Sequence, residues 1–181
     1  IQQLKYGERN IFLEGKGPQL DAYRAPTDND AGMGYPTAWF QNGLYDMQHT
    51  VKDWSYTAKK DGTYQLNFTV ESQGKEGADQ KYSNRDRDPE SAYRFGEDKR
   101  ALKEDDLKFT TRQIYTIYRD GSIELQSAIS ANRSNVVLPR IGYSMVLPSG
   151  LDAFDYYGRG PINNYPDRKT SQFVGWYHSA V

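Results

Sequence analysis

Three ionisable side chains and an amide lie within the seven residues RAPTDND, at positions 24–30. Asp28 and Asp30 are two residues apart, so on an extended strand both carboxylates would point to the same side. Paired carboxylates can act as acid and base in glycoside hydrolysis, and Asp-Asn-Asp offers oxygen ligands to Ca²⁺ or Mg²⁺. The competing interpretation is structural, because Asp and Asn stabilise turns and Arg24 can pair with a nearby carboxylate. We favour a structural corner over a ligand contact, and a ligand contact over catalysis.

A second polar loop, YYGRGPINNYPDR at positions 156–168, combines two glycines and two prolines with hydrogen-bonding side chains. Such a restrained loop can present donors and acceptors to sugar hydroxyls or form a satisfied corner, and we favour the corner. Its candidate residues are Arg159, Asn163, Asn164, Asp167 and Arg168. The two histidines, His49 and His178, lie in no motif, and the chain has no nucleophile elbow, P-loop, zinc or dinucleotide motif. Spacing alone therefore names no reaction.

Composition excludes several classes of protein. The net charge of -1 leaves no basic excess for a general nucleic-acid surface, and no apolar run approaches the length of a membrane span. The absence of cysteine excludes disulfides and thiolate chemistry. The chain begins with Ile rather than Met, so we expect a piece of a longer protein. The compartment, cytoplasmic or periplasmic, is left open.

Alternation of apolar and polar residues predicts two β-hairpins, whose loops Lys-Asp-Gly and Arg-Asp-Gly end at Gly62 and Gly121. A two-residue turn would set Tyr56 opposite the polar Asn67. A three-residue loop sets Tyr56 opposite Leu66 and keeps the apolar side chains on one face. We therefore expect both glycines in the left-handed conformation, each forming a bulge.

The remaining pattern predicts an all-β fold of two packed antiparallel sheets in a single domain over residues 1–181. One short helix is expected from Pro36 to about Asn42, with a proline in its first turn. Residues 72–106 are polar and dense in both charges, which predicts a long charged excursion from the sheet. Further strands are expected at Ile11–Leu13, Phe109–Tyr118, Ile123–Ile129, Ile141–Leu147, Phe154–Tyr157 and Phe173–Tyr177.

Four segments together resemble one family: RAPTDND at 24–30, LPRIG at 138–142, LPSGL at 147–151, and GRGP followed by NYPDR at 158–168. Their order and spacing resemble the C-terminal small-chain domain of large bacterial β-galactosidases of glycoside hydrolase family 2. The resemblance covers roughly residues 20–181. It implies an antiparallel β-supersandwich that is galactose-mutarotase-like. It also implies that the domain is truncated here and continues in the family to a later aromatic that lines the sugar site.

The resemblance implies a function for the parent protein rather than for this chain. Family members hydrolyse terminal β-D-galactosides with retention, using two glutamates on a separate (β/α)8 barrel, and bind magnesium and sodium mostly on other domains. We therefore expect no catalytic residue, metal site or cofactor here. The expected partners are the remaining domains, the galactoside substrate and possible further copies in a homo-oligomer, with no nucleic acid and no membrane.

In the family the segment just after D-N-D is a mobile loop beside the active site, whose base the chain's own corner would fix. Carried over, the substrate-flanking residues are Asp30, Gly32, Met33, Gly34 and Tyr35, and the corner also includes Arg24, Asp28 and Asn29. This sequence departs from the family twice. The loop is shorter than in the best-known relatives, and Asn163 stands where a glutamate is usual, which weakens any contact made by that carboxylate.

Two other functions are weighed against this one. The fifteen tyrosines and three tryptophans motivate a carbohydrate-binding module, which needs exposed, coplanar aromatic rings. Fold analogy alone suggests a mutarotase-like sugar epimerase, which needs a histidine and a carboxylate across one cleft.

Overall fold

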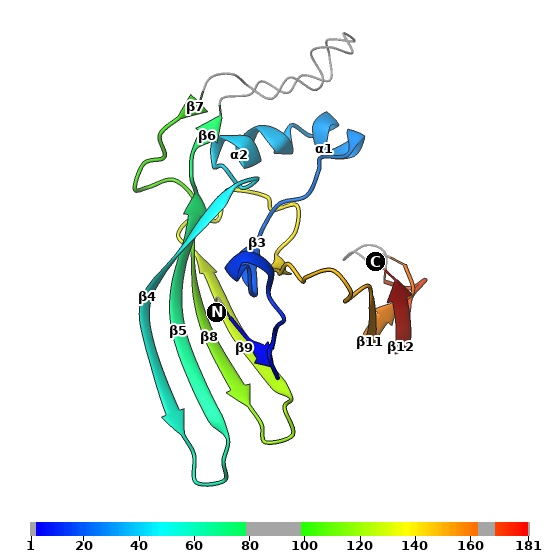
Figure 1. The fold of residues 1–181 in the computed structure, drawn as a ribbon. Coiled ribbons are helices and arrows are strands. Elements are labelled where there is room, and N and C mark those ends of the chain that lie inside the picture. Colours follow the sequence, from blue (N-terminus) through cyan, green and yellow to red (C-terminus); the bar gives the residue numbers. More distant parts are fainter. Residues whose placement is uncertain (1–2, 79–98, 163–168, 181) are drawn as a thin grey trace. The chain divides into compact units, whose positions relative to one another are not determined.

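The computed structural model describes residues 3–78, 99–162 and 169–180, and these parts consist mostly of antiparallel strands (Figure 1). The all-β fold class is thereby confirmed. The chain divides into a central unit, Gln19–Ser144, and a terminal unit made of Ile1–Pro18 and Met145–Val181. One family domain can contain two compact units, so the single domain over 1–181 stays a prediction.

The elements follow one another along the chain with short connections. They are β1 (Lys5–Tyr6), β2 (Arg9–Asn10), the 3-10 turn η1 (Leu13–Gly15), β3 (Gln19–Asp21), α1 (Asp28–Gly32), α2 (Tyr35–Gln41), β4 (Met47–Ala58), β5 (Tyr64–Gly74), β6 (Gly77–Ala78), β7 (Lys99–Arg100), β8 (Lys108–Ile117), β9 (Ile123–Ala131), β10 (Gly142–Ser144), β11 (Ala153–Gly160) and β12 (Phe173–Ala180).

The central unit is built on an antiparallel sheet of order β4-β5-β8-β9, formed by two long hairpins (Figure 1). Tyr56 pairs with Leu66, as predicted. Gly62 has φ 82° and Gly121 has φ 86°, so both adopt the left-handed conformation. At the first loop the Gly62 N–H donates to Lys59 O at 3.1 Å, and the second loop repeats this pattern. The predicted three-residue loops are confirmed, because only they keep the apolar face continuous.

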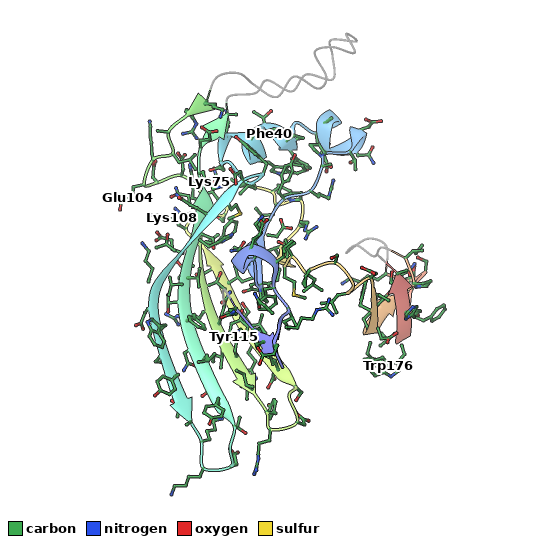
Figure 2. The ribbon with its side chains drawn as sticks, in the orientation of Figure 1. Phe40, Lys75, Glu104, Lys108, Tyr115 and Trp176 are labelled. Atoms are coloured by element: carbon green, nitrogen blue, oxygen red, sulfur yellow. The ribbon has the colours of Figure 1, made fainter. Side chains whose placement is uncertain are left out.

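The core of the central unit lies where α2 packs on the sheet. Its buried cluster consists of Leu20, Ala22, Trp39, Leu44, Leu107 and Phe109. The indole N–H of Trp39 donates to Val137 O at 2.6 Å, which satisfies the one polar atom of this ring. Tyr115 is buried on β8 (Figure 2), and burial, with a further contribution from Tyr143, raises the pKa of Tyr115 to about 12.

The terminal unit contains the β1-β2 pair and the β11-β12 hairpin. Arg9 Nη2 donates to Ser149 O at 3.0 Å and the Leu13 N–H donates to Val146 O at 2.8 Å, which ties the two parts of this unit together. β11 and β12 pair along their whole length. Large aromatic side chains of this hairpin are exposed, among them Trp176 (Figure 2).

Two predicted strands are wrong or too long. Ile11–Leu13 is not a strand, because the Asn10 side chain accepts from the Phe12 N–H and donates to Phe12 O, which turns the backbone away from extended pairing. Only Gly142–Ser144 of the predicted Ile141–Leu147 strand is paired. Its partner β3 is three residues long and follows Pro18, which has no N–H to extend the ladder.

The predicted helix is confirmed as α2, which begins one residue early at Tyr35. The prediction of a single helix is wrong, because α1 precedes it. The charged excursion is shorter than 72–106, since β5 extends to Gly74 and β6 pairs with β7. Residues 79–98 of that excursion lie outside the described residues.

Candidate functional site

The residues of the first candidate cluster lie on a helical turn rather than on a strand. The Asp30 carboxylate accepts from the Thr27 N–H at 2.8 Å, and the Thr27 hydroxyl accepts from the Asp30 N–H at 3.4 Å. This reciprocal capping box starts α1 at Asp28. The expectation that Asp28 and Asp30 share a side is therefore wrong, because residues two apart on a helix do not face each other.

Asp30 is held by a fork of charged hydrogen bonds. Arg24 Nη1 lies 2.5 Å from Asp30 Oδ2, and Nη2 lies 3.0 Å from Oδ1. The guanidinium also sits 5.7 Å from the ring centre of Trp39, within the range of a cation–π contact. Burial favours the neutral acid, but the hydrogen bonds from Arg24 and Thr27 outweigh it, and the pKa of Asp30 falls below its ordinary value. The carboxylate is ionised and its lone pairs are occupied.

The other two members of this cluster are different. Asp28 and Asn29 are exposed at the start of α1. No side-chain hydrogen bond joins Asp28 or Asn29 to the described part of the chain. Arg24 and Asp30 thus form the rigid part of the corner, and Asp28 and Asn29 form its solvent face.

The predicted substrate-flanking residues form a tight connection between two helices. Gly32 ends α1, and the Met33 N–H donates to Asn29 O at 3.1 Å. Gly34 has φ 72°, a left-handed conformation that glycine adopts without strain, and directly precedes α2. Met33 is 67% exposed, whereas Tyr35 packs against the core. Whether this connection flanks a substrate stays a prediction.

The second polar loop is only partly within the described residues. Arg159 on β11 donates through Nη1 to Lys169 O and Gln172 O, both at 3.1 Å. Gln172, which the sequence did not single out, is buried, and its Oε1 accepts from the Ile162 N–H at 3.1 Å. These bonds join the two ends of the loop. Asn163, Asn164, Asp167 and Arg168 lie outside the described residues.

A second clamp with the same construction lies in the predicted excursion. Arg100 forks onto Asp106 with distances of 2.8 and 3.1 Å, and the Lys103 N–H donates to Asp106 Oδ2 at 2.7 Å. In both clamps an arginine grips the aspartate six residues later, and the backbone N–H midway between them adds a bond to the same carboxylate. The shared spacing Arg-Ala-x-x-x-x-Asp was the signal that could have revealed this second clamp. Its recurrence supports a structural interpretation of the first.

The described residues contain no cluster of three or more His, Cys, Asp or Glu side chains arranged to hold a metal ion. Among the helices that the structure describes, none is long and apolar enough to cross a membrane.

With the all-β fold and the corner in place, comparison with known proteins defines the class of this chain. The family model for the β-galactosidase small chain matches residues 1–181, and the chain belongs to that family. This finding confirms the resemblance carried by the four segments.

Individual relatives are also named β-galactosidase. The chain is 29% identical over 182 residues to the protein of Lactobacillus delbrueckii subsp. bulgaricus and 28% identical over 183 residues to that of Psychromonas ingrahamii. These matches cover 98% and 96% of the chain but only 14% of either relative. A shorter match to the Vibrio cholerae protein is 37% identical over 75 residues, 41% of this chain and 7% of that protein. The chain therefore spans a small fraction of these relatives, which contain further domains.

Proposed function

We propose that this chain is a non-catalytic domain of an enzyme that hydrolyses terminal β-D-galactosides. In this proposal it forms one wall of the galactose pocket and supports assembly of the whole enzyme. The observation that carries the proposal is the state of Asp30, the least exposed carboxylate of the candidate cluster, which is ionised and occupied by Arg24 and Thr27.

The geometry supports a non-catalytic role. A general acid for glycoside cleavage needs a carboxyl group whose pKa is raised so that it holds its proton near neutral pH. The pKa of Asp30 is lowered instead, and Asp28 points from the exposed first turn of α1. The acid and the nucleophile are then supplied by other parts of the parent polypeptide, for which we propose the (β/α)8 barrel together with its metal ions.

The β11-β12 hairpin supports a role in assembly. Phe173 on one face is 75% exposed, and Trp176 on the other face is 76% exposed. A two-stranded hairpin is marginally stable in water, and large apolar groups on both faces favour cover from both sides. We propose that other domains of the parent provide this cover, and that the assembled enzyme is a homo-oligomer.

Producing the parent enzyme in two pieces tests this proposal. One piece is this chain and the other is the rest of the polypeptide, and each is assayed with a nitrophenyl β-galactoside. We expect turnover only after mixing, because the catalytic groups lie in one piece and a wall of the pocket in the other. A remainder that is fully active without this chain would contradict the assembly role.

The exposed aromatic side chains of β4 favour a second candidate, a carbohydrate-binding module. Trp54 is 61% exposed and Tyr56 is 65% exposed, and both lie on the same face of an edge strand. Calorimetric titration with galactosides tests this candidate. Loss of the binding heat in Trp54→Ala would support it, whereas titration of the native chain without any heat would remove it.

A further inference from the structure

A pocket of about 310 Å³ opens in the central unit beside the beginning of β4. Its lining comes from β3, from the segment Leu44–Met47 with His49, and from β10, all of which belong to that unit. The volume corresponds to about ten water molecules at bulk density. It lies at the lower end of the range for small-molecule sites.

Three side chains that line this pocket have hydrogen-bonding atoms to spare. His49 is half-buried on β4, and its Nδ1 lies 2.9 Å from Ser72 Oγ. Its Nε2 makes no hydrogen bond to any residue that the structure describes. Within the same described ranges, the hydroxyls of Tyr23 and Tyr45 make none either. The pocket thus offers one imidazole nitrogen and two phenol oxygens to a ligand.

The charged groups at the pocket are already neutralised. Asp21 Oδ2 lies 2.7 Å from Arg140 Nη2, and Asp46 Oδ1 lies 2.7 Å from Lys75 Nζ. Each carboxylate therefore has a cation of its own, and each cation has an anion. This balance favours a neutral ligand over a free cation or anion.

The remaining titratable groups are neutral near pH 7. Burial lowers the pKa of His49, and Lys75 lowers it further while Asp21 raises it. Burial raises the pKa of Tyr23, and that of Tyr45 is raised first by burial and then by the nearby Glu76. The imidazole can therefore accept or donate, and both phenols keep their protons.

Apolar surface lies next to these polar atoms. Leu20 and Leu44 are buried at the pocket wall, and the rings of Tyr23 and Tyr45 meet edge to face with their centres 6.3 Å apart. A saturated ring with hydroxyls on its rim and C–H groups on its faces satisfies both kinds of lining.

We propose that this pocket binds a neutral polyol of the size of one pyranose ring, with His49, Tyr23 and Tyr45 as its hydrogen-bonding partners. The proposal rests on the pocket's own lining and stands apart from the proposed function. The ring belongs either to a free monosaccharide or to the end of an oligosaccharide, which share this chemistry.

NMR titration of the 181-residue chain tests the proposal. The probes are galactose, glucose, myo-inositol and lactose, each raised to high millimolar concentration. We expect at least one of them to produce saturable shifts in the backbone amides of residues 20–23 and 44–49. A response to lactose but not to free sugars identifies the end of an oligosaccharide as the ligand.

Variants locate the bound molecule. Tyr23→Phe and Tyr45→Phe each remove one hydroxyl, and each should weaken binding about five- to tenfold, as for one lost hydrogen bond. His49→Gln should weaken binding as well. The matched control is Tyr64→Phe, which removes an exposed phenol hydroxyl elsewhere on the central sheet and should leave the affinity unchanged.

Two results would overturn the proposal. One is the absence of saturable shifts with every probe. The other is binding that persists unchanged in the Tyr23→Phe/Tyr45→Phe double variant, and its loss in Trp54→Ala instead would assign it to the exposed face of β4. Hydrolysis by the two mixed pieces of the parent enzyme depends on neither result, so failure of this proposal and failure of the proposed function are distinguishable.

Discussion

At the scale of single residues, the carboxylates of the candidate cluster contribute to structure through their partners. Asp30 receives four hydrogen bonds, from two guanidinium nitrogens and from the N–H and hydroxyl of Thr27. Asp106 is gripped in the same way by Arg100 and the Lys103 N–H. Side chains held so firmly fix the ends of loops, which is what a wall beside a binding site requires.

Asp30→Asn should destabilise the central unit, because it removes both the ion pair with Arg24 and half of the capping box. We expect the free energy of unfolding to fall by roughly 1.5–3 kcal/mol, the cost of hydrogen bonds to a charged group. Urea denaturation measures this change. The matched control is Asp28→Asn, which alters an exposed carboxylate one turn position away and should change stability by less than about 0.5 kcal/mol. Equal losses in both variants would contradict the corner.

Asp106 predicts how stability depends on pH. The hydrogen bond from Arg100 is the main cause that lowers the pKa of Asp106, with help from the Lys103 N–H and Arg133, against the effect of burial. A carboxyl group whose pKa is lower in the folded state stabilises the protein above its unfolded pKa of 3.8. That contribution is lost as the pH falls through the lower folded value.

Urea denaturation at a series of pH values from neutral down to about 3 should therefore show a smaller acid-induced loss of stability in Asp106→Asn than in the native chain. The variant should be the less stable of the two at neutral pH. Parallel curves for the two proteins would contradict the lowered pKa.

At the scale of elements, glycines act in two distinct ways. Gly121 supplies the left-handed conformation of a hairpin loop, and a Cβ placed there would meet no atom within 4 Å. Gly77 on β6 has an ordinary backbone, but a Cβ placed there would lie 2.2 Å from Gln41 O at the end of α2. The first glycine is needed for its conformation and the second for close packing of α2 against the strand.

Gly77→Ala should accordingly cost more than Gly121→Ala. The alanine at 121 suffers only the left-handed backbone, about 1–2 kcal/mol, whereas the alanine at 77 collides with a backbone carbonyl and should cost about 3 kcal/mol or more. Thermal unfolding of the two variants, monitored by circular dichroism, makes the comparison. A milder effect at Gly77 than at Gly121 would contradict the close approach.

Local patterns predicted the elements whose cause is local. The Tyr56–Leu66 pairing and the left-handed Gly62 followed from alternation, because a shift of one residue would reverse the faces. Helix α1 was missed because a side-chain capping box creates it, not an apolar period. The Ile11–Leu13 strand failed for a similar reason, since Asn10 bonds to the backbone of Phe12.

The candidate site was predictable as a set of residues but not as a geometry. The motif placed Arg24 and Asp30 in one cluster, and the structure shows which of its acids is gripped. The pocket at His49 was not predictable, because its lining is assembled from β3, the start of β4 and β10, which are distant in sequence. Alternation also predicts which face of a strand a side chain takes, but not what covers that face.

At the scale of the whole molecule, the three tryptophans report on assembly. Trp39 is buried in the core at 1% exposure, whereas Trp54 and Trp176 are 61% and 76% exposed. In the isolated chain, iodide should quench the fluorescence of the two exposed indoles and spare that of Trp39.

When this chain joins the rest of the parent polypeptide, quenching of Trp176 should fall, because we propose that other domains cover the β11-β12 hairpin. The variant Trp39→Phe/Trp54→Phe leaves Trp176 as the only tryptophan of the chain, and a tryptophan-free remainder allows its signal to be followed alone. Undiminished quenching in the active assembled enzyme would contradict the proposed cover.

The central claim is that the groups that break the glycosidic bond lie outside these 181 residues. Its most direct test is the hydrolysis of a nitrophenyl β-galactoside by the purified chain alone, in a preparation from a host without any β-galactosidase. We predict release of nitrophenol at the rate of the buffer blank at every protein concentration. A rate that rises in proportion to the concentration of the chain, and that follows it through successive purification steps, would contradict the account.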